Sequence, residues 1–312
     1  MQHRQLGATE LKVSRLSFGG SSLGGVFRQV DEAEAIRAVH AAVDGGINYF
    51  DVAPAYGGGR SEIVLGKALA SLPRDKFLLS TKVGKYTSPT SYGEDVFDYS
   101  AERIRRSIDD SCRTLGVEDL DIVYLHDIEY NGGQHTDWAL GEGLETLHKL
   151  KGEGRLGAVG GGFYPIALWH RVIADCDIDV GMTHNHYCLN DTQLTDLLPA
   201  AEGRGVGLVN ASPFASGLLT DRGPADWHPA SPEHRALFCS AAEHCRQQGA
   251  NISQLALRFS VDHPQIATTM FSSASPASVR RNLEWIQSPL DATLVAEVQA
   301  ILAPLSNREW DY

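Results

Sequence analysis

Three predicted strands end in a carboxylate, a lysine and a histidine, and a tyrosine stands just beyond the first of them. Asp51 closes one apolar run, Tyr56 follows it in front of three glycines, and Lys82 and His126 close two later runs. A buried lysine beside a tyrosine favours the phenolate and lowers the pKa of the phenol from about 10, and a carboxylate keeps that lysine charged. Tyr56 would then exchange a proton with a substrate hydroxyl near neutral pH.

These four side chains can meet only if the ends of their strands share one face of the fold. Eight apolar runs of strand length are each followed by a helical pattern, with Gly or Pro at most junctions. Eight right-handed βα units close into a barrel whose active site lies at the carboxyl ends of the strands. We therefore predict an α/β fold, a (β/α)8 TIM barrel, formed by one domain over residues 1–312. An open doubly wound sheet is the alternative.

The expected elements can be placed by residue. A short β-hairpin over residues 3–13 precedes the barrel. The expected strands are 16–18, 47–51, 77–82, 121–126, 156–160, 178–184, 206–211 and 266–271. The expected helices are near 33–43, 61–71, 100–115, 139–151, 165–174, 191–202, 251–262 and 276–286. The longest irregular segment, residues 212–235, is long for a compact domain and is expected to be a functional loop.

Composition narrows the class of protein. The chain has 312 residues and a formal net charge of −12, which argues against a nucleic-acid or anionic-membrane surface. No apolar run approaches the roughly 20 residues that span a bilayer, and the amino terminus lacks a signal-peptide core. Five cysteines without a CxxC pair indicate reduced thiols. We expect a cytoplasmic protein, and nothing in the pattern decides its oligomeric state.

Several motifs together resemble the aldo-keto reductase superfamily over nearly the whole chain. They are Phe50-Asp51 with Tyr56, the strand-ending Lys82, Leu125-His126-Asp127, and Ser212-Pro213-Phe214-Ala215-Ser216-Gly217-Leu218-Leu219. Within it, the chain is most similar to the L-galactose dehydrogenase type. That likeness lies in His126-Asp127-Ile128-Glu129, Asn210-Ala211-Ser212-Pro213, Gly217-Leu218-Leu219-Thr220-Asp221, Gly223-Pro224 and Trp227-His228-Pro229.

The resemblance implies a nicotinamide cofactor bound without a Rossmann fold, and no G-x-G-x-x-G follows any predicted strand. It makes Asp51, Tyr56, Lys82 and His126 the catalytic tetrad, with Tyr56, His126 and Asp127 at the substrate and no metal. The implied cofactor positions are Gly20, Ser21, Asp51, His184, Ser212, Pro213, Phe214, Ser216, Gly217, Leu218, Phe271, Ser272, Ser273, Ser278, Arg281 and Asn282. Backbone donors of the 212–218 loop and the helix beginning after Ser275 suit phosphates.

The chain departs from the family pattern at three places. Ala211 stands where many members stack an aromatic ring on the nicotinamide, and Gly160-Gly161-Gly162-Phe163 stands where they carry Ser-Asn. Ser272 and Ser278 occupy the positions of basic residues that clamp the 2′-phosphate of NADP. Losing those partners favours NAD, although a shifted Arg281 would restore NADP binding.

The resemblance implies oxidation of the C1 hydroxyl of an aldose such as L-galactose, L-fucose or D-arabinose to a lactone. Loops 85–99, 127–138 and 212–235 are expected to decide the substrate. One alternative is a reductase or dehydrogenase of another carbonyl or alcohol, such as pyridoxal or a small aldehyde. Another is a nicotinamide-binding regulatory subunit that turns over slowly.

Simpler interpretations of the same residues remain open. Asp51 and Lys82 would also suit a structural ion pair at the barrel rim. His184 and His186 alternate on one strand and would suit a metal, although no third ligand follows at a useful spacing. The pattern Gly20-Ser21-Ser22-Leu23-Gly24 matches the nucleophile elbow of serine hydrolases, which requires a helix immediately afterwards.

Overall fold

Eight parallel strands close the barrel and follow one another around it in sequence order. The computed structural model describes residues 1–26, 29–87 and 95–311. The barrel strands are β3 (Leu16–Gly19), β4 (Tyr49–Asp51), β5 (Leu78–Val83), β8 (Leu120–His126), β9 (Leu156–Gly162), β10 (Val180–His184), β11 (Gly207–Ala211) and β12 (Thr268–Ser272). β12 pairs with β3, so the ring closes and the predicted (β/α)8 barrel is confirmed.

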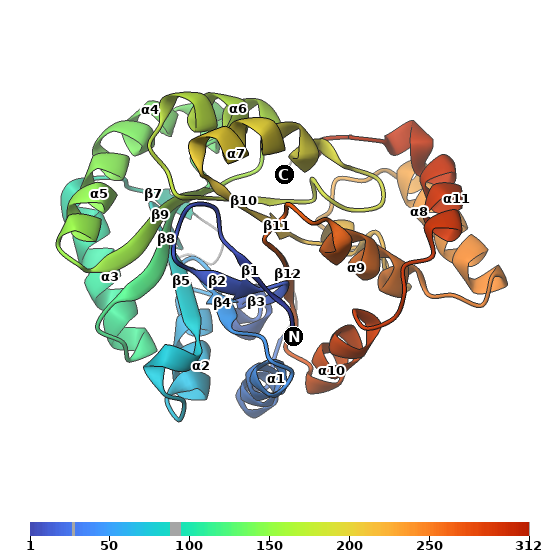
Figure 1. Cartoon of the computed structure of the whole chain (residues 1–312), viewed down its shortest axis with the longest axis horizontal. Coiled ribbons are helices and arrows are strands. Elements are labelled where there is room, and N and C mark those ends of the chain that lie inside the picture. The colour runs from blue at the N-terminus through green and yellow to red at the C-terminus, as the bar shows by residue number, and fades with distance from the viewer. Residues whose placement is uncertain (27–28, 88–94, 312) are drawn as a thin grey trace.

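Helices surround the barrel and connect its strands (Figure 1). They are α1 (Glu32–Asp44), α2 (Arg60–Leu69), α3 (Ala101–Leu115), α4 (Thr136–Trp138), α5 (Leu144–Gly152), α6 (Ile166–Asp175), α7 (Leu198–Arg204), α8 (Pro232–Gln247), α9 (Ile252–Asp262), α10 (Pro276–Trp285) and α11 (Ala292–Leu302). Side chains that prefer the N-cap position fix several starts: Asp31, Ser100 and Ser275 each accept a hydrogen bond from the backbone N–H three residues later.

The structure differs from the sequence prediction in several segments, and helices α8 and α11 have no counterpart among the expected helices. The helix expected at 191–202 is a 3-10 turn, Gln193–Leu197, followed by α7, because Pro199 favours the first turn of a new helix. The irregular segment expected to reach 235 ends at Ser231, which caps α8. The segment after β5 forms a small hairpin of β6 (Lys85–Thr87) and β7 (Asp95–Phe97), although residues 88–94 of the expected substrate loop lie outside the described residues.

The amino-terminal hairpin of β1 (His3–Gln5) and β2 (Lys12–Ser14) packs against the interior of the barrel. Leu6 and Val13 share one buried cluster with Tyr49 and Tyr124 from the strands. Ala8 donates its backbone N–H to the carbonyl of Gly205 at 2.7 Å, close to the amino end of β11. The hairpin therefore occupies the end of the barrel opposite the carboxyl ends of the strands.

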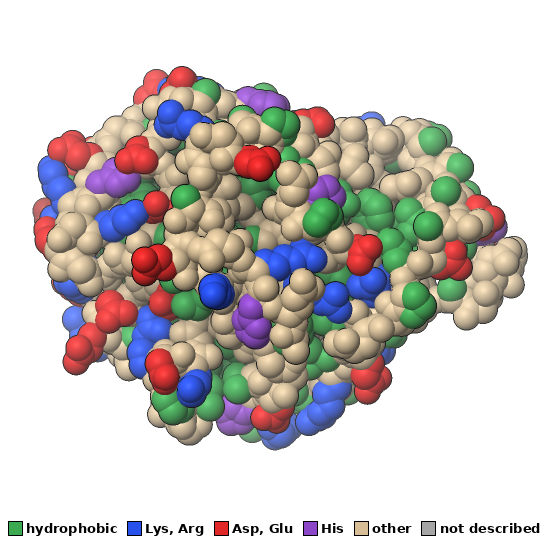
Figure 2. All heavy atoms as spheres, in the orientation of Figure 1, with side chains coloured by type: hydrophobic (Ala, Val, Ile, Leu, Met, Phe, Trp, Pro, Cys, Tyr) green, Lys and Arg blue, Asp and Glu red, His purple; other side chains and the backbone are tan. Residues whose placement is uncertain are grey.

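Helices α8 and α11 lie side by side at one edge of the molecule (Figure 1). Their facing side chains, among them Phe238 and Val298, form a second apolar cluster. Figure 2 shows acidic and basic side chains interspersed over one face of the molecule. Within the described residues, no helix combines the length and the apolar character needed to cross a bilayer.

Candidate active site

Lys82 and Asp51 form a buried ion pair at the carboxyl ends of β5 and β4. Lys82 Nζ lies 2.5 Å from Asp51 Oδ2 and also donates to the carbonyl of Val52 at 2.9 Å. The other carboxylate oxygen of Asp51 accepts from Ser80 Oγ at 2.6 Å. Burial lowers the pKa of Lys82, but Asp51 and Tyr56 raise it by more, so the ammonium stays charged.

A buried chain of hydroxyls supports this ion pair from inside the barrel. Tyr124 and Tyr49 share a hydrogen bond of 2.8 Å between their hydroxyls, and Tyr49 Oη lies 3.0 Å from Ser80 Oγ. Ser80 in turn holds Asp51. Burial raises the pKa of both tyrosines well above the usual value, so they remain neutral donors.

The Tyr56 ring contacts both Lys82 and His126. Lys82 Nζ lies 4.6 Å from the centroid of the Tyr56 ring, and the His126 ring meets it edge-on with centroids 5.7 Å apart. Gly57 makes the turn that follows: its φ is +62°, and a Cβ there would lie 2.2 Å from the carbonyl oxygen of Gly24. The structure thus brings together the four residues predicted as the tetrad.

The pKa of Tyr56 departs from the sequence expectation. Lys82 does lower it, as predicted, but burial of the phenol raises it by more, with Asp51 adding to the increase. The net pKa lies above the ordinary value of 10, so the phenol is protonated at neutral pH. The expectation that the pKa of the phenol lies below 10 is therefore wrong, because it omitted desolvation.

His126 is a neutral imidazole. Burial lowers its pKa to about 3, helped by the cations of Lys82 and Lys85 and opposed by Asp127. Its Nε2 lies 3.7 Å from Asp127 Oδ2, whereas its buried Nδ1 has no hydrogen-bond partner among the described residues. A neutral ring can donate a hydrogen bond from one nitrogen and accept one at the other.

Asp127 pairs with a second buried lysine that the sequence analysis missed. Lys85 Nζ lies 2.8 Å from Asp127 Oδ2 and 3.9 Å from the centroid of the Tyr130 ring. The only sequence signal was a second lysine three residues after Lys82. Asp127 has φ of +48°, an uncommon conformation for a non-glycine residue that recurs at functional sites.

A residue with positive φ also follows two further strands. Asn185 follows β10 with φ of +65°, and Ser212 follows β11 with φ of +61°. Asn185 Nδ2 donates to Ser216 Oγ at 2.9 Å, which joins the two loops. The loop from Ser212 to Leu218, predicted to bind cofactor, is therefore held against the end of β10.

The other predicted cofactor residues lie in the turn after β3, at the ends of β10 and β12, in the loop after β11 and on α10. Gly20 and Ser21 begin the turn after β3, and the neighbouring Ser22 donates its backbone N–H to Ser272 Oγ at 2.9 Å. Ser272 Oγ also donates to Ser22 Oγ at 2.8 Å. The members on or around β12, α10 and the 212–218 loop are Phe271, Ser273, Ser278, Arg281, Asn282, Pro213, Phe214 and Gly217. His184, at the end of β10, stacks on Tyr164 with ring centroids 4.8 Å apart.

The glycines of β9 have a packing explanation. A Cβ at Gly160 would lie 2.5 Å from the ring of Tyr124, and one at Gly161 would lie 2.5 Å from the ring of Phe163. Phe163 stacks on Trp169 with centroids 3.8 Å apart. Gly160 and Gly161 therefore leave space for aromatic rings on both sides of β9.

Two of the simpler interpretations, the serine nucleophile and the metal site, can be compared with the geometry. Ser22, the would-be elbow nucleophile, exchanges hydrogen bonds with Ser272, and a 3-10 turn over Ser21–Gly24 replaces the required helix. His186 lies 2.9 Å from the carbonyl of Tyr164 and 3.3 Å from Asp191. Across residues 1–26, 29–87 and 95–311, no three His, Cys, Asp or Glu side chains are grouped to hold a metal.

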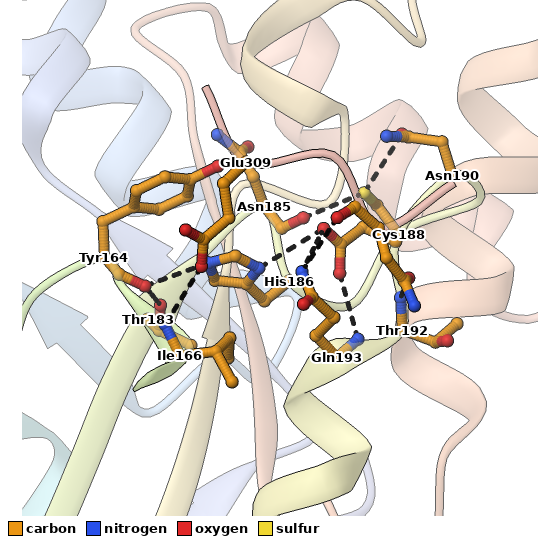
Figure 3. Close-up of polar contacts among 12 residues, drawn as sticks. Tyr164, Ile166, Thr183, Asn185, His186, Cys188, Asn190, Thr192, Gln193 and Glu309 are labelled. Atoms are coloured by element: carbon orange, nitrogen blue, oxygen red, sulfur yellow. Dashed lines mark hydrogen bonds and ion pairs between the residues drawn. The ribbon is translucent and has the colours of Figure 1, made fainter. Parts of the chain in front are cut away.

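Tyr164 connects the mouth of the barrel to the carboxyl-terminal segment, a relationship with no local sequence signal. Its backbone N–H donates to Glu129 Oε1 at 2.8 Å, and its hydroxyl accepts from the backbone N–H of Trp310 at 2.9 Å. Figure 3 shows Tyr164 beside His186, with Glu309 reaching back to Ile166. The terminal segment thus contacts residues that also touch the candidate site.

Comparison with known proteins adds independent information. The model of the Aldo/keto reductase family matches residues 15–303. L-galactose dehydrogenase of Arabidopsis thaliana is 39% identical over 98% of this chain and 96% of its own. D-threo-aldose 1-dehydrogenase of a Pseudomonas species is 30% identical over 95% and 97%. The holo form of an aldo-keto reductase from Bacillus halodurans matches with a TM-score of 0.80 and 26% identity, covering 100% of this chain and 98% of that one.

Proposed function

The chain belongs to the aldo/keto reductase family, and on that premise we propose that this NAD(P)-dependent oxidoreductase oxidises the C1 hydroxyl of an aldose to a lactone. The proposed substrates are L-galactose, L-fucose and D-arabinose. Relatives that span nearly the whole chain are named as dehydrogenases of L-galactose and of D-threo-aldoses, which supports this class. The charged and polar lining around Asp127 and Lys85 also suits a polyhydroxylated substrate better than an apolar one.

The observation that carries the proposal is the contact of Tyr56 with both Lys82 and His126. Tyr56 Oη takes the proton of the C1 hydroxyl, and the Lys82 ammonium stabilises the phenolate that can accept it. Asp51 holds Lys82, and the neutral His126 orients the substrate oxygen by a hydrogen bond. Asp127, next to His126, contacts the same substrate.

A nicotinamide dinucleotide fits the donors at the ends of β3, β11 and β12. The serine hydroxyls in these loops and the capped first turn of α10 are neutral donors of the kind that bind a pyrophosphate and ribose hydroxyls. The residues proposed to hold it are Gly20, Ser21, Asp51, His184, Ser212, Pro213, Phe214, Ser216, Gly217, Leu218, Phe271, Ser272, Ser273, Ser278, Arg281 and Asn282. When bound, the cofactor supplies a two-electron acceptor for the hydride from C1.

We propose NAD as the preferred cofactor. The Ser272 hydroxyl is hydrogen-bonded to Ser22. Neither Ser272 nor Ser278 carries a positive charge that would pair with a 2′-phosphate. The guanidinium of Arg281 lies 5.0 Å from the centroid of the Trp285 ring and so already has an aromatic partner.

The test is the initial rate of appearance of reduced cofactor with L-galactose, L-fucose and D-arabinose, each with NAD and with NADP. Turnover with NAD supports both parts of the proposal. Turnover only with NADP would assign Arg281 or its neighbour Arg280 to the phosphate. Absence of turnover with every sugar would contradict the substrate class and leave the oxidoreductase assignment in place.

A further inference from the structure

Glu129 carries a buried oxygen that the protein itself leaves without a partner. It lies three residues beyond His126, in the loop that follows β8. Oε1 accepts the backbone N–H of Tyr164 at 2.8 Å, whereas Oε2 is buried and has no hydrogen-bond partner among the described residues. A buried acceptor without a donor costs about 1–3 kcal/mol in a protein, so its retention calls for an explanation.

The surroundings of Glu129 belong to the candidate site. Asp127, two residues earlier, pairs with Lys85, and the charges of both affect the pKa of Glu129. His126, only 5% exposed, also has a buried nitrogen without a partner among the described residues. His126 Nδ1, at the end of β8, and Glu129 Oε2, in the loop that follows, are therefore two unsatisfied polar atoms close in the chain to the residue that pairs with Lys85.

On the basis of the proposed function, we infer that Glu129 determines specificity by accepting, at Oε2, a hydrogen bond from a hydroxyl of the aldose other than the one at C1. The backbone bond from Tyr164 fixes the carboxylate, so little side-chain freedom is lost when the sugar binds. An aldehyde or alcohol without further hydroxyls would leave Oε2 buried and unsatisfied. A site built to pair a substrate hydroxyl discriminates against analogues that lack it.

The pKa of Glu129 supports this role. Burial and the nearby charge of Asp127 together raise it to about 7, against the opposing effects of the backbone N–H groups of Tyr164 and Glu129 and of Lys85. The carboxylate is thus costly to ionise in the free protein, and a hydroxyl donor at Oε2 would offset that cost.

The test combines variants of Glu129 with deoxy forms of whichever aldose the wild-type protein oxidises. Glu129→Gln retains a carbonyl oxygen for the Tyr164 N–H but removes the charge, and Glu129→Leu removes both oxygens. For one deoxygenated position, kcat/KM of the wild-type protein should fall roughly tenfold or more. In Glu129→Leu, which has lost that contact, the same deoxygenation should cost less than about twofold.

Controls separate this inference from the proposed function and from a folding defect. Glu118→Gln, an exposed carboxyl, should behave as wild type with every sugar. NAD binding followed by fluorescence should be unchanged in both Glu129 variants. Equal deoxygenation penalties in wild type and variants at every position would overturn the inference. A wild-type protein inactive with all aldoses would contradict the proposed function instead, and Glu129 would then lose its assigned ligand.

Discussion

Lys82 Nζ lies 2.5 Å from Asp51 Oδ2 and 4.6 Å from the centroid of the Tyr56 ring. One ammonium thus contacts both a carboxylate that keeps it charged and a phenol whose ionised form it stabilises. The pair is almost fully buried, with side-chain exposures of 2% and 3%. Lys82 therefore both stabilises the folded protein through Asp51 and supports the proton transfer proposed for Tyr56.

Replacing Tyr56 by Phe should lower turnover by a factor on the order of 10² or more, the usual contribution of general acid–base catalysis. NAD affinity should stay the same, because the ring and its contacts with Lys82 and His126 remain. Steady-state rates and cofactor fluorescence titration measure the two effects. Tyr187→Phe, a tyrosine stacked on Phe259, is the control. Near-normal turnover of Tyr56→Phe would rule out the proposed proton transfer.

Breaking the buried ion pair from either side should destabilise the protein. Asp51→Asn and Lys82→Met each leave an uncompensated buried partner, a change that typically costs about 3–5 kcal/mol. The double variant should cost less than the sum of the two, because no isolated charge remains. Urea unfolding measures the free energies. The exposed pair Lys67 and Glu32 provides the control cycle, with an expected coupling below about 1 kcal/mol.

The rate of aldose oxidation should rise with pH well above neutrality. Oxidation requires the ionised Tyr56 as base, and burial raises the pKa of this phenol above 10 in the free protein. The base form therefore becomes more abundant as the pH increases, and kcat/KM for oxidation should follow it. A profile that is flat from pH 6 to about pH 10 would contradict Tyr56 as the group that titrates.

Glu129→Gln should stabilise the folded protein at alkaline pH. The carboxyl has an ordinary pKa of 4.5 and a folded-state pKa of about 7. Between these values the folded state holds a proton that the unfolded chain has lost, so the stability of the wild type falls as pH rises from 4.5 to 7. At pH 8 the variant should be more stable by about 1–3 kcal/mol, and near pH 4 the difference should vanish. Urea unfolding at each pH measures the difference in free energy of unfolding between wild type and Glu129→Gln. A difference that stays the same from pH 4 to pH 8 would exclude the raised pKa.

Ending the chain at Asn307, which keeps the hydrogen bonds of Asn307 to Asn190 and Thr192, should weaken aldose binding more than cofactor binding. Loss of the terminal residues removes the bond from Trp310 N to Tyr164 Oη and the contact of Glu309 with Ile166 (Figure 3). Tyr164 would then hold Glu129 and the His184 ring less firmly. KM for the sugar should increase roughly tenfold, the worth of one or two hydrogen bonds, with the Kd for NAD unchanged.

Arg308→Ala is the matched control for the truncation. The Arg308 guanidinium lies 5.3 Å from the centroid of the Trp310 ring, so its loss leaves the backbone bond of Trp310 in place. This variant should keep the wild-type KM. An equal rise of KM and Kd in the truncated protein would indicate a general loss of structure, which a thermal melt would also reveal.

The sequence alone determined the barrel and the approximate position of the candidate active site on it. Alternating strand and helix patterns depend on short-range periodicity, and the polar residues that end β4, β5 and β8 stand out against apolar runs. Motif spacing then singled out Tyr56. Helices α8 and α11 were missed, because α8 begins inside a proline-rich segment and α11 follows the last barrel unit.

Only the tertiary structure decided which charges meet and how they titrate. Lys85 pairs with Asp127, 42 residues away. Tyr164 bonds both to Glu129 and to Trp310, and Trp310 lies 146 residues after Tyr164 in the chain. No local pattern encodes contacts at such separations. Tyr56 illustrates the electrostatic side: its lysine neighbour was predictable, but its pKa depends on desolvation by the whole fold, which outweighs that neighbour.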